Sequence, residues 1–359
     1  MKKLLIFLLA VLCLTLVSCG KEYEPVKSTE EEARVVYTMF LDGEVYVVRY
    51  ELYRAFFLNN KSLVDGGDDS VWSSADAERY ISEINEIIFD RIGDIYAVFS
   101  FAKSLDINPY SAVVEDTIYD YIVLSVEGNG GDIKGHGSYE RFLVSLKEEN
   151  MNYAVMELLL RYSIVYSLIS EEYNGVTDEV LGQLPGNIEI SRDEVFSYYM
   201  GDECARVLQM VCPDYEKMQE HKSRLAEKKT DKERALYIIN QSTALHTDCI
   251  VDKEISGVIV GKYATDSTVY GEYTDKVFSL SVGASTDIVA VNDGTRTYYL
   301  AYKLEKTEEH FDRCYDAIKQ SYIDNELGRR LESIKGALVG SIELYEAYNG
   351  INHSRISMD

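Results

Sequence analysis

The chain has 359 residues, of which 46% are apolar and 27% charged, an ordinary globular composition that excludes a wholly disordered or collagen-like polymer. Length alone suggests about two domains. Acidic residues outnumber basic ones by 61 to 36, which gives a formal charge of −25, so nucleic acid is a poor partner. The 29 tyrosines are unusually many and place amphipathic rings wherever they are not buried.

The first segment has the pattern of an export signal. Lys2 and Lys3 precede an apolar run from Leu4 to Val17, which as a helix covers about 21 Å and is too short for a bilayer core of ~30 Å. We therefore expect residues 1–18 to be a signal peptide. Residues 16–19 read Leu-Val-Ser-Cys and resemble the bacterial lipobox, which implies that Cys19 is acylated and anchors the chain to a membrane. The alternative is an ordinary secretory signal with an incidental cysteine.

The segment after the signal is polar and lacks periodicity. We expect residues 19–33 to be an acylated, solvated tether, with the folded body beginning near Arg34. Removal of Lys2 and Lys3 moves the formal charge from −25 to −27. An anionic leaflet repels so acidic a surface, and such a tether would let the body stand clear of it.

Four cysteines follow Cys19 in the mature chain, namely Cys204, Cys212, Cys249 and Cys314. An even number in an exported protein permits up to two disulfides. Because residues 204–212 look extended, the ends of that segment would be about 26 Å apart, and any disulfide must join one of them to Cys249 or Cys314. No CxxC spacing occurs, so neither a redox motif nor a zinc ribbon is supported, and we expect no metal or cofactor.

The body opens with a strand and then becomes helical. The run Val35–Leu41, closed by Asp42 and Gly43, predicts a strand and a turn. Spacings of 4, 3 and 4 then predict an amphipathic helix with the stripe Tyr46, Tyr50, Tyr53 and Phe57. After a loop at 65–69, further helices are expected from 73 to before 108, and over 111–126, 139–151 and 153–169, with the helical region closing near 184–186.

The glycine-rich loop at 128–137 does not have the pattern of a phosphate cradle. It lacks the G-x-x-x-x-G-K-[ST] order, and no apolar strand precedes it. We therefore favour a mobile surface loop, in which His136 is solvated.

A second region begins at Glu189. Ser191 and Glu194 form an S-x-x-E capping box that predicts a helix through Tyr199. A strand is expected over 203–211, then helical structure over 215–243 with a break near 228–231. A hairpin is expected over 287–305, because Asp293-Gly294 separates two strand-like runs.

The last region is helical again, with apolar residues near 3.6-residue spacing from Phe311 to Tyr345. So long a stripe cannot bury itself alone. We expect it to pack on the amino-terminal helices, which makes the small sheet region an insertion between two parts of one helical lobe.

This order of parts resembles the exported foldases of the PrsA and SurA type, which have a lipoprotein signal, a helical chaperone lobe, a parvulin-like module and a closing helix. In the lobe the matching stretches are Leu41–Phe57, Trp72, Ile92–Asp106 and Tyr139–Glu149. In the module they are Val195–Tyr199, Ala205–Met210 and Lys276–Gly283, the last with Phe278 and Leu280 before Gly283 as in the F-x-L-x-x-G turn of the family.

The resemblance implies cis/trans isomerisation of X-Pro bonds, in a pocket with an apolar floor and a polar cluster that includes two histidines and a Cys or Asp. Here Val207 occupies the first histidine position, and residues 297–301 contain no imidazole where the second is expected. Cys249 is a candidate for the Cys or Asp position, with a buried or disulfide-bonded cysteine as the alternative. Tyr273 and Phe278 are candidates for the proline floor, with core aromatics as the alternative. We therefore expect weak or absent catalysis.

These features together predict an α+β chain with five segments: a signal peptide, an acylated tether, a SurA-N-like helical chaperone lobe, a parvulin-like antiparallel-sheet module and a closing helix that packs on the lobe. Their expected bounds are residues 1–18, 19–33, 34–187, 188–305 and 306–359.

The expected function is that of a membrane-anchored extracytoplasmic foldase or holdase that acts on unfolded or newly exported polypeptides. One alternative is an active peptidyl-prolyl isomerase. Another is a non-catalytic acidic surface lipoprotein that binds a fixed partner or cations. Neither HExxH, G-x-S-x-G nor a dinucleotide fingerprint occurs, so hydrolases and oxidoreductases have little support.

Overall fold

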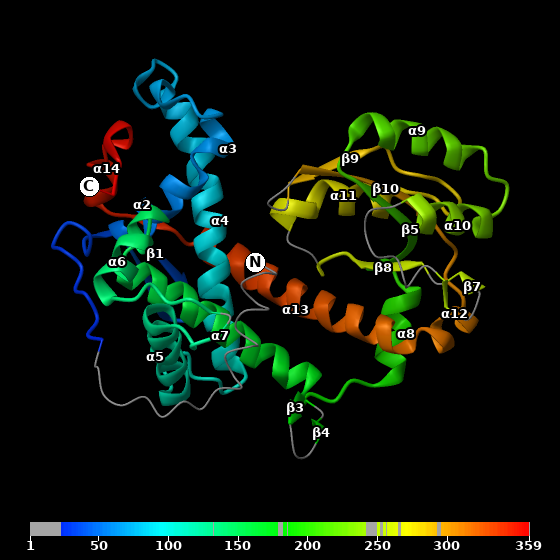
Figure 1. Cartoon of the computed structure of the whole chain (residues 1–359), viewed down its shortest axis with the longest axis horizontal. Helices are drawn as coiled ribbons and strands as arrows, with labels where there is room; N and C mark the ends of the chain where they lie inside the picture. The colour runs from blue at the N-terminus through cyan, green and yellow to red at the C-terminus, as the bar shows by residue number, and fades with distance from the viewer. Residues whose placement is uncertain are drawn as a thin grey trace. The chain divides into compact units, whose positions relative to one another are not determined.

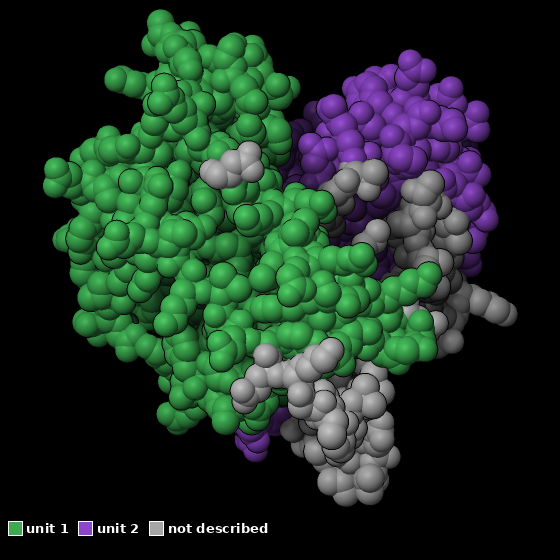
Figure 2. All heavy atoms as spheres, turned by 60° about the vertical axis from the view of Figure 1, so that its left-hand side comes forward, with its two compact units in different colours: residues 1–184, 331–359 green, residues 185–330 purple. Residues whose placement is uncertain are grey.

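A computed structural model shows an α+β chain, as expected, that divides into two compact units. Unit 1 comprises residues 1–184 and 331–359, and unit 2 comprises residues 185–330. Figure 1 shows the helices and strands, and Figure 2 colours unit 1 green and unit 2 purple. The structure describes residues 23–131, 133–178, 182–184, 186–241, 250–251, 254–255, 257–264, 267–292 and 296–358.

Unit 1 begins with a small antiparallel sheet in the order β11-β1-β2. Strands β1 (Val35–Leu41) and β2 (Glu44–Arg49) are joined by Asp42 and Gly43, both at positive φ, as a two-residue hairpin turn requires. The prediction that Tyr46 belongs to a helix was wrong. Tyr46 lies in β2, and helix α2 (Tyr50–Asn60) begins four residues later. Pairing across the turn makes β2 alternate, so Tyr46 and Val48 are buried.

The longer helices that remain in unit 1 follow the predicted order, whereas two short ones before them were not predicted. In chain order these helices are α3 (Ser62–Asp65), the 3-10 helix η1 (Asp69–Ser73), α4 (Ala77–Ser104), α5 (Ala112–Glu127), α6 (Tyr139–Glu148) and α7 (Tyr153–Asn174), before the short strands β3 (Val176–Asp178) and β4 (Gly182–Leu184). Helix α4 packs against α2 and α7. Its apolar face, with Ile84, Ile88 and Ile92 fully buried, forms much of the core. Helix α7 is long and apolar enough to cross a membrane, but half of its apolar window is buried inside the protein.

The glycine-rich loop is held more firmly than expected. His136 N donates to Ser125 O and Gly137 N donates to Val126 O, which fixes the loop on the end of α5. His136 is exposed, as expected for a solvated residue.

The amino-terminal segment is attached to unit 1 instead of forming a free tether. Tyr23 donates to Glu127 Oε1 at 2.7 Å, and its ring lies 5.2 Å from that of Tyr139. A few residues later, Ser28 donates to the buried Glu51. We call residues 23–34 the strap. Tyr23, Ser28 and Glu32 of the strap have partners distant in the sequence, which local composition does not reveal.

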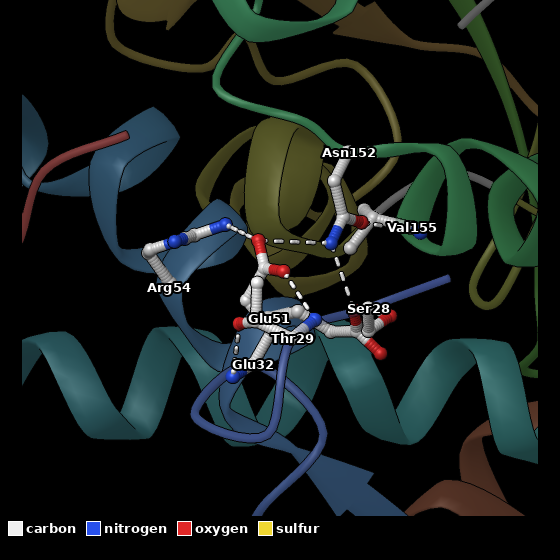
Figure 3. A network of polar contacts seen from close by, with 7 residues as sticks. All are labelled: Ser28, Thr29, Glu32, Glu51, Arg54, Asn152 and Val155. Carbon is white, nitrogen blue, oxygen red and sulfur yellow. Dashed lines mark hydrogen bonds and ion pairs between the residues drawn. The ribbon is translucent and has the colours of Figure 1, made fainter. Parts of the chain in front are cut away.

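A polar network holds the end of the strap (Figure 3). Arg54 donates to Glu32 Oε1 at 2.7 Å. The Nδ2 atom of Asn152 donates to Glu51 Oε2 at 2.7 Å and to Glu32 Oε1 at 3.3 Å, while its Oδ1 atom accepts from the backbone N–H of Val155 at the start of α7. One amide therefore caps a helix and joins the two carboxylates to it.

The carboxyl-terminal segment completes unit 1. Helix α13 (Tyr315–Gly340) runs from one unit into the other, and its residues from Leu331 belong to unit 1. Lys335 is buried between helices, and its Nζ lies 3.0 Å from Asp90 Oδ1, 3.2 Å from Asp94 Oδ1 and 2.8 Å from Glu332 Oε1. A Cβ at Gly93 would lie 3.0 Å from Lys335 Cγ, so glycine allows α4 and α13 to approach.

The sequence predicts a helical stripe that continues to Tyr345, and this prediction was wrong at its end. Helix α13 ends at Gly340, and β11 (Glu343–Leu344) then pairs with β1. The Ser341 hydroxyl oxygen accepts from the backbone N–H of Phe40 at 2.7 Å. The chain ends in α14 (Glu346–Asn349) and the 3-10 helix η3 (His353–Arg355). The tail therefore contributes a strand and a cluster of side chains to the amino-terminal part of the chain.

Unit 2 contains a four-stranded antiparallel sheet in the order β8-β5-β10-β9. The strands are β5 (Cys204–Cys212), β8 (Val258–Gly261), β9 (Val289–Asn292) and β10 (Arg296–Lys303), with β6 (Ile250–Val251) and β7 (Glu254–Ile255) forming a separate pair. The helices are α8 (Arg192–Met200), α9 (Tyr215–Ala226), α10 (Asp231–Gln241), α11 (Ser267–Ser279), α12 (Glu308–Arg313) and the first part of α13. The predicted capping box, the helix break near 228–231 and the hairpin of β9 and β10 are all present.

Alternate residues of β5 face different helices. Leu208, Met210 and Cys212 pack with α9 and α10, whereas Ala205 and Val207 pack with α11. The sheet is therefore covered on both faces.

The boundaries of the units differ from the expected segments at two points. They fall at 184/185 and 330/331, whereas the sequence suggests 187/188 and 305/306. Residues 306–330, which we expected to pack on the helical lobe, cluster with unit 2 because Phe311, Cys314 and Ile318 pack against α8 and the start of β5.

Candidate functional site

The candidate proline pocket lies on the face of the unit 2 sheet that α11 covers. Tyr273 is only 4% exposed and packs with Val207, Val277 and Ala301 in one buried cluster, with Phe278 partly buried against it. The structure thus brings Val207, Tyr273 and Phe278 together in one cluster. The packing around Tyr273 is that of a core residue.

Polar groups on this face bond to each other. The Tyr273 hydroxyl donates to Gln209 Oε1 at 2.7 Å, and its ring centroid lies 5.2 Å from that of Tyr299. Burial raises the pKa of Tyr273 well above its ordinary value, so the phenol stays protonated at physiological pH. It is a hydrogen-bond donor and does not serve as a base.

The cation that pairs across the sheet with the first expected histidine position has a structural role. Lys303 pairs with Val207 across β5 and β10, and its Nζ donates to Leu280 O at 2.9 Å, with Val277 O and Phe278 O at 3.4 Å. It therefore neutralises the carbonyl end of α11. Burial lowers the pKa of Lys303. Sequence reasoning missed Gln209 and Lys303, although the alternation of β5 and β10 could have placed both on this face.

Imidazoles lie elsewhere in the described part of unit 2. Tyr199 and His310 Nδ1 are 2.9 Å apart in the cluster of α8 and α12, and His221 Nδ1 is 2.7 Å from the Tyr237 hydroxyl between α9 and α10. Neither histidine belongs to the α11 face. Among the side chains that the structure describes, this face offers apolar surface, one phenol–amide pair and Lys303, whose ammonium is engaged by carbonyl oxygens of α11 and the residue after it. Such a face can desolvate an imide bond, but it lacks the imidazoles that the resemblance implies for the polar cluster.

The cysteine candidates are described in part. Cys19 and Cys249 lie outside the described residues. Cys204 and Cys212 are buried thiols, and Cys314 is buried as well. Burial raises the pKa of Cys204 to about 11, which keeps it protonated and unreactive. Within the residues described, no group of His, Cys, Asp and Glu side chains is arranged to hold a metal ion.

Two surfaces could contact an extended polypeptide. In unit 1, Val45 and Val47 are 54% and 42% exposed on the outer face of edge strand β2, beside Phe40 of β1. In unit 2, a groove of about 540 Å³ lies between α8 and α13, with Tyr198 and Tyr322 at its floor and acidic residues around it. Exposed apolar strips and tyrosine-lined grooves are suited to binding apolar and aromatic side chains.

No protein-family profile matches the sequence, and no curated protein matches it. Among solved structures, the chain is similar to the foldase protein PrsA from Streptococcus pneumoniae str. Canada MDR_19A, with 14% identity over 87% of this chain and 97% of that chain and a TM-score of 0.30. It is also similar to the foldase protein PrsA from Lactococcus lactis, with 10% identity over 90% and 99% and a TM-score of 0.26. It is similar as well to PrsA from Bacillus subtilis, with 12% identity over 74% of this chain and 87% of that chain and a TM-score of 0.24.

Proposed function

We propose that this chain is a membrane-anchored, extracytoplasmic folding factor that holds newly exported polypeptides, and that its isomerase activity is weak or lost. The observation that carries the proposal is the order of the parts. Residues 331–359 complete the unit opened by residues 23–184, and residues 185–330 form a separate unit around a small antiparallel sheet. This is the arrangement that the resemblance to exported foldases implies.

The loss of catalysis is supported by the composition of the α11 face. Val207 stands at the first histidine position and is fully buried, and Tyr273 is packed above the sheet. Rotation about an imide bond needs no covalent chemistry, so desolvation alone would leave at most slow catalysis.

Client binding is supported by the apolar strip of Val45 and Val47 and by the net charge. A strip on an edge strand can receive an extended apolar segment. The formal charge of −25 would keep a complex with an unfolded client soluble.

Membrane attachment through Cys19 would place unit 1 close to the bilayer. Tyr23 contacts the body of unit 1, and the four residue steps from Cys19 to Tyr23 span at most about 14 Å. The strap therefore leaves little free chain, in contrast to the solvated tether over residues 19–33 that the sequence predicts.

The decisive experiment measures aggregation of a reduced, unfolded client with the mature chain carrying Cys19→Ser, which prevents acylation. We expect suppression at a few-fold molar excess. A Val45→Thr/Val47→Thr variant, which removes apolar surface but keeps strand-forming residues, should suppress aggregation less. The matched control is Val113→Thr/Val144→Thr, which changes two exposed valines on helices. Absence of suppression at several-fold excess would refute the proposal.

The two alternatives have their own outcomes in companion assays. Acceleration of a proline-limited refolding reaction would support the active isomerase, whereas a rate equal to that in buffer would remove it. Copurification of one stoichiometric partner, instead of a spread of clients, would favour the fixed-partner lipoprotein.

A further inference from the structure

Unit 2 contains a cavity of about 320 Å³ on the sheet face opposite to α11. It lies between α9, α10, strands β5 and β10, and residues 283–285. Cavities of roughly 300–1,000 Å³ with an apolar lining and a few polar groups are the usual form of small-ligand sites. The candidate proline pocket does not include this cavity.

The floor of the cavity is aliphatic. It is formed by Leu208, Leu225, Ile238 and Leu300, which belong to the buried cluster beneath α9 and α10. Each of these side chains is at most 8% exposed. The floor is therefore preformed, and it matches a compact branched aliphatic group.

The charges of the cavity oppose the charge of the chain as a whole. Lys222 and Arg234 are the charged residues of the lining, and the lining as described contains no carboxylate. The chain as a whole, by contrast, has 61 acidic and 36 basic residues. Arg234 stacks over the ring of Tyr302 with its Cζ 4.4 Å from the ring centroid, which orients the guanidinium. The hydroxyl-bearing Ser285 also lines the cavity.

The present partners of the two cations lie toward solvent. Arg234 Nη1 donates to Asp231 Oδ1 at 2.9 Å, and Lys222 Nζ lies 2.8 Å from Asp287 Oδ1. The Asp231 and Asp287 side chains are 47% and 83% exposed, and such pairs contribute little to stability. A ligand carboxylate inside the cavity can compete with them, because both cations line the cavity and the setting there is less polar.

We propose that this cavity binds a carboxylate carried on a compact branched aliphatic body. Two sources share that chemistry: the carboxyl-terminal leucine-like residue of a polypeptide, and a free short-chain branched acid. The inference goes beyond the proposed function and does not require holdase activity.

The test is titration calorimetry with the mature chain carrying Cys19→Ser, with saturation-transfer NMR to identify the bound protons. The probes are N-acetyl-leucine, its uncharged amide N-acetyl-leucinamide, and 4-methylpentanoate. We expect the acids to bind and the amide to bind at least about tenfold more weakly, because it lacks the charge-assisted hydrogen bonds. Tighter binding of N-acetyl-leucine than of 4-methylpentanoate would identify a polypeptide terminus as the source, and the reverse order would identify a free acid.

Variants locate the site. Arg234→Gln and, separately, Lys222→Gln should each weaken binding of N-acetyl-leucine several-fold. The matched control is Arg79→Gln, because Arg79 pairs with Glu83 at 2.8 Å and lies 4.2 Å from the centroid of the Tyr80 ring, the same arrangement outside the cavity. Equal binding of acid and amide, or unchanged binding in both cavity variants, would overturn the proposal. Lys222 is surface-exposed enough to be replaced without loss of folding, so the test does not depend on Arg234 alone.

Discussion

The hydroxyl oxygen of Tyr53 lies 2.9 Å from Nε2 of His353, 300 residues later in the chain. Tyr53 donates its own proton to Asn85 Oδ1 at 2.8 Å, so its oxygen accepts the Nε2–H of a neutral His353. The imidazole is 9% exposed and also lies against Phe57 and Tyr348. This contact joins the carboxyl-terminal tail to α2 in the core of unit 1.

The stability of unit 1 should therefore decrease in mild acid. Burial lowers the pKa of His353 to about 4 in the folded state, from 6.5. The histidine contribution is fully present above pH 6.5 and is lost as the pH falls through 4, a change of about 2–3 kcal/mol. The free energy of unfolding should be measured between pH 7.5 and 4.5 by fluorescence of Trp72, the one tryptophan, which is buried in unit 1.

The variant His353→Gln should lose this dependence. The difference in unfolding free energy between wild type and His353→Gln should shrink as the pH falls, whereas His136→Gln, which replaces an exposed histidine of the same unit, should follow the wild type. A wild-type pH profile in His353→Gln would show that the imidazole does not titrate on unfolding.

Asp94 should change the stability of unit 1 in the opposite direction, so that its contribution is lost as the pH rises. Burial raises the pKa of Asp94 to about 6, with Asp90 adding to the rise and Lys335 opposing it. A group with a raised pKa stabilises the fold below its unfolded value of 3.8, and this contribution is lost as the pH rises through 6. Because 42% of the Asp94 side chain is exposed, solvent screening reduces the effect to about 1 kcal/mol.

Asp94→Asn tests this sign. Its unfolding free energy relative to wild type should rise by about 1 kcal/mol between pH 4 and pH 7.5, again followed by Trp72 fluorescence. The control is Asp106→Asn, at an exposed position after α4. A constant difference across this range would mean that Asp94 ionises normally in the folded chain.

The local signals of the sequence predicted much of this fold. The Ser191–Glu194 capping box, the turn at Asp42-Gly43 and the pairing of β9 with β10 each involve residues a few positions apart, and each is present. Tyr46 shows the limit of periodicity, because an alternating strand followed by a helix can mimic a spacing of 4, 3 and 4. The adjacent turn was the signal that could have corrected it.

Contacts between distant segments could not be predicted in this way. The pairing of β11 with β1, the bond of Tyr23 to Glu127 and the burial of Lys335 depend on partners over a hundred residues away. At the candidate site, the substitution at Val207 was readable from sequence, but the engagement of Gln209 and Lys303 by their neighbours depends on the register of β5 and β10.

Tyr273 should behave as a structural residue. Tyr273→Phe removes the bond to Gln209 and should destabilise unit 2 by about 1 kcal/mol, and Tyr273→Ala should cost roughly 3–5 kcal/mol because it empties the packed space above Val207. Calorimetric unfolding measures both. Tyr215→Phe, at a tyrosine that is 46% exposed in the same unit, should change stability little. If Tyr273→Phe instead left stability unchanged and altered client refolding, the residue would belong to a binding floor.

Asn152 should control whether the strap stays attached. Asn152→Asp keeps the oxygen that caps α7 but places a third carboxylate beside Glu32 and Glu51, so the amide donor is lost and like charges repel. We expect a loss of about 2 kcal/mol in the unfolding free energy of unit 1. Trypsin cleavage after Lys27, within the strap, should also become faster, because the strap must detach for cleavage.

Ser138→Ala is the control for the cap alone. Ser138 accepts from the backbone N–H of Arg141 at the start of α6, so its loss should cost about 1 kcal/mol without faster cleavage at Lys27. Equal cleavage rates in Asn152→Asp and wild type would show that the contacts of Tyr23 and Arg54 hold the strap without the amide. In that case the contact of Tyr23 alone would limit the distance between Cys19 and unit 1 to the length of residues 19–23. The network around Glu51 would not affect that distance.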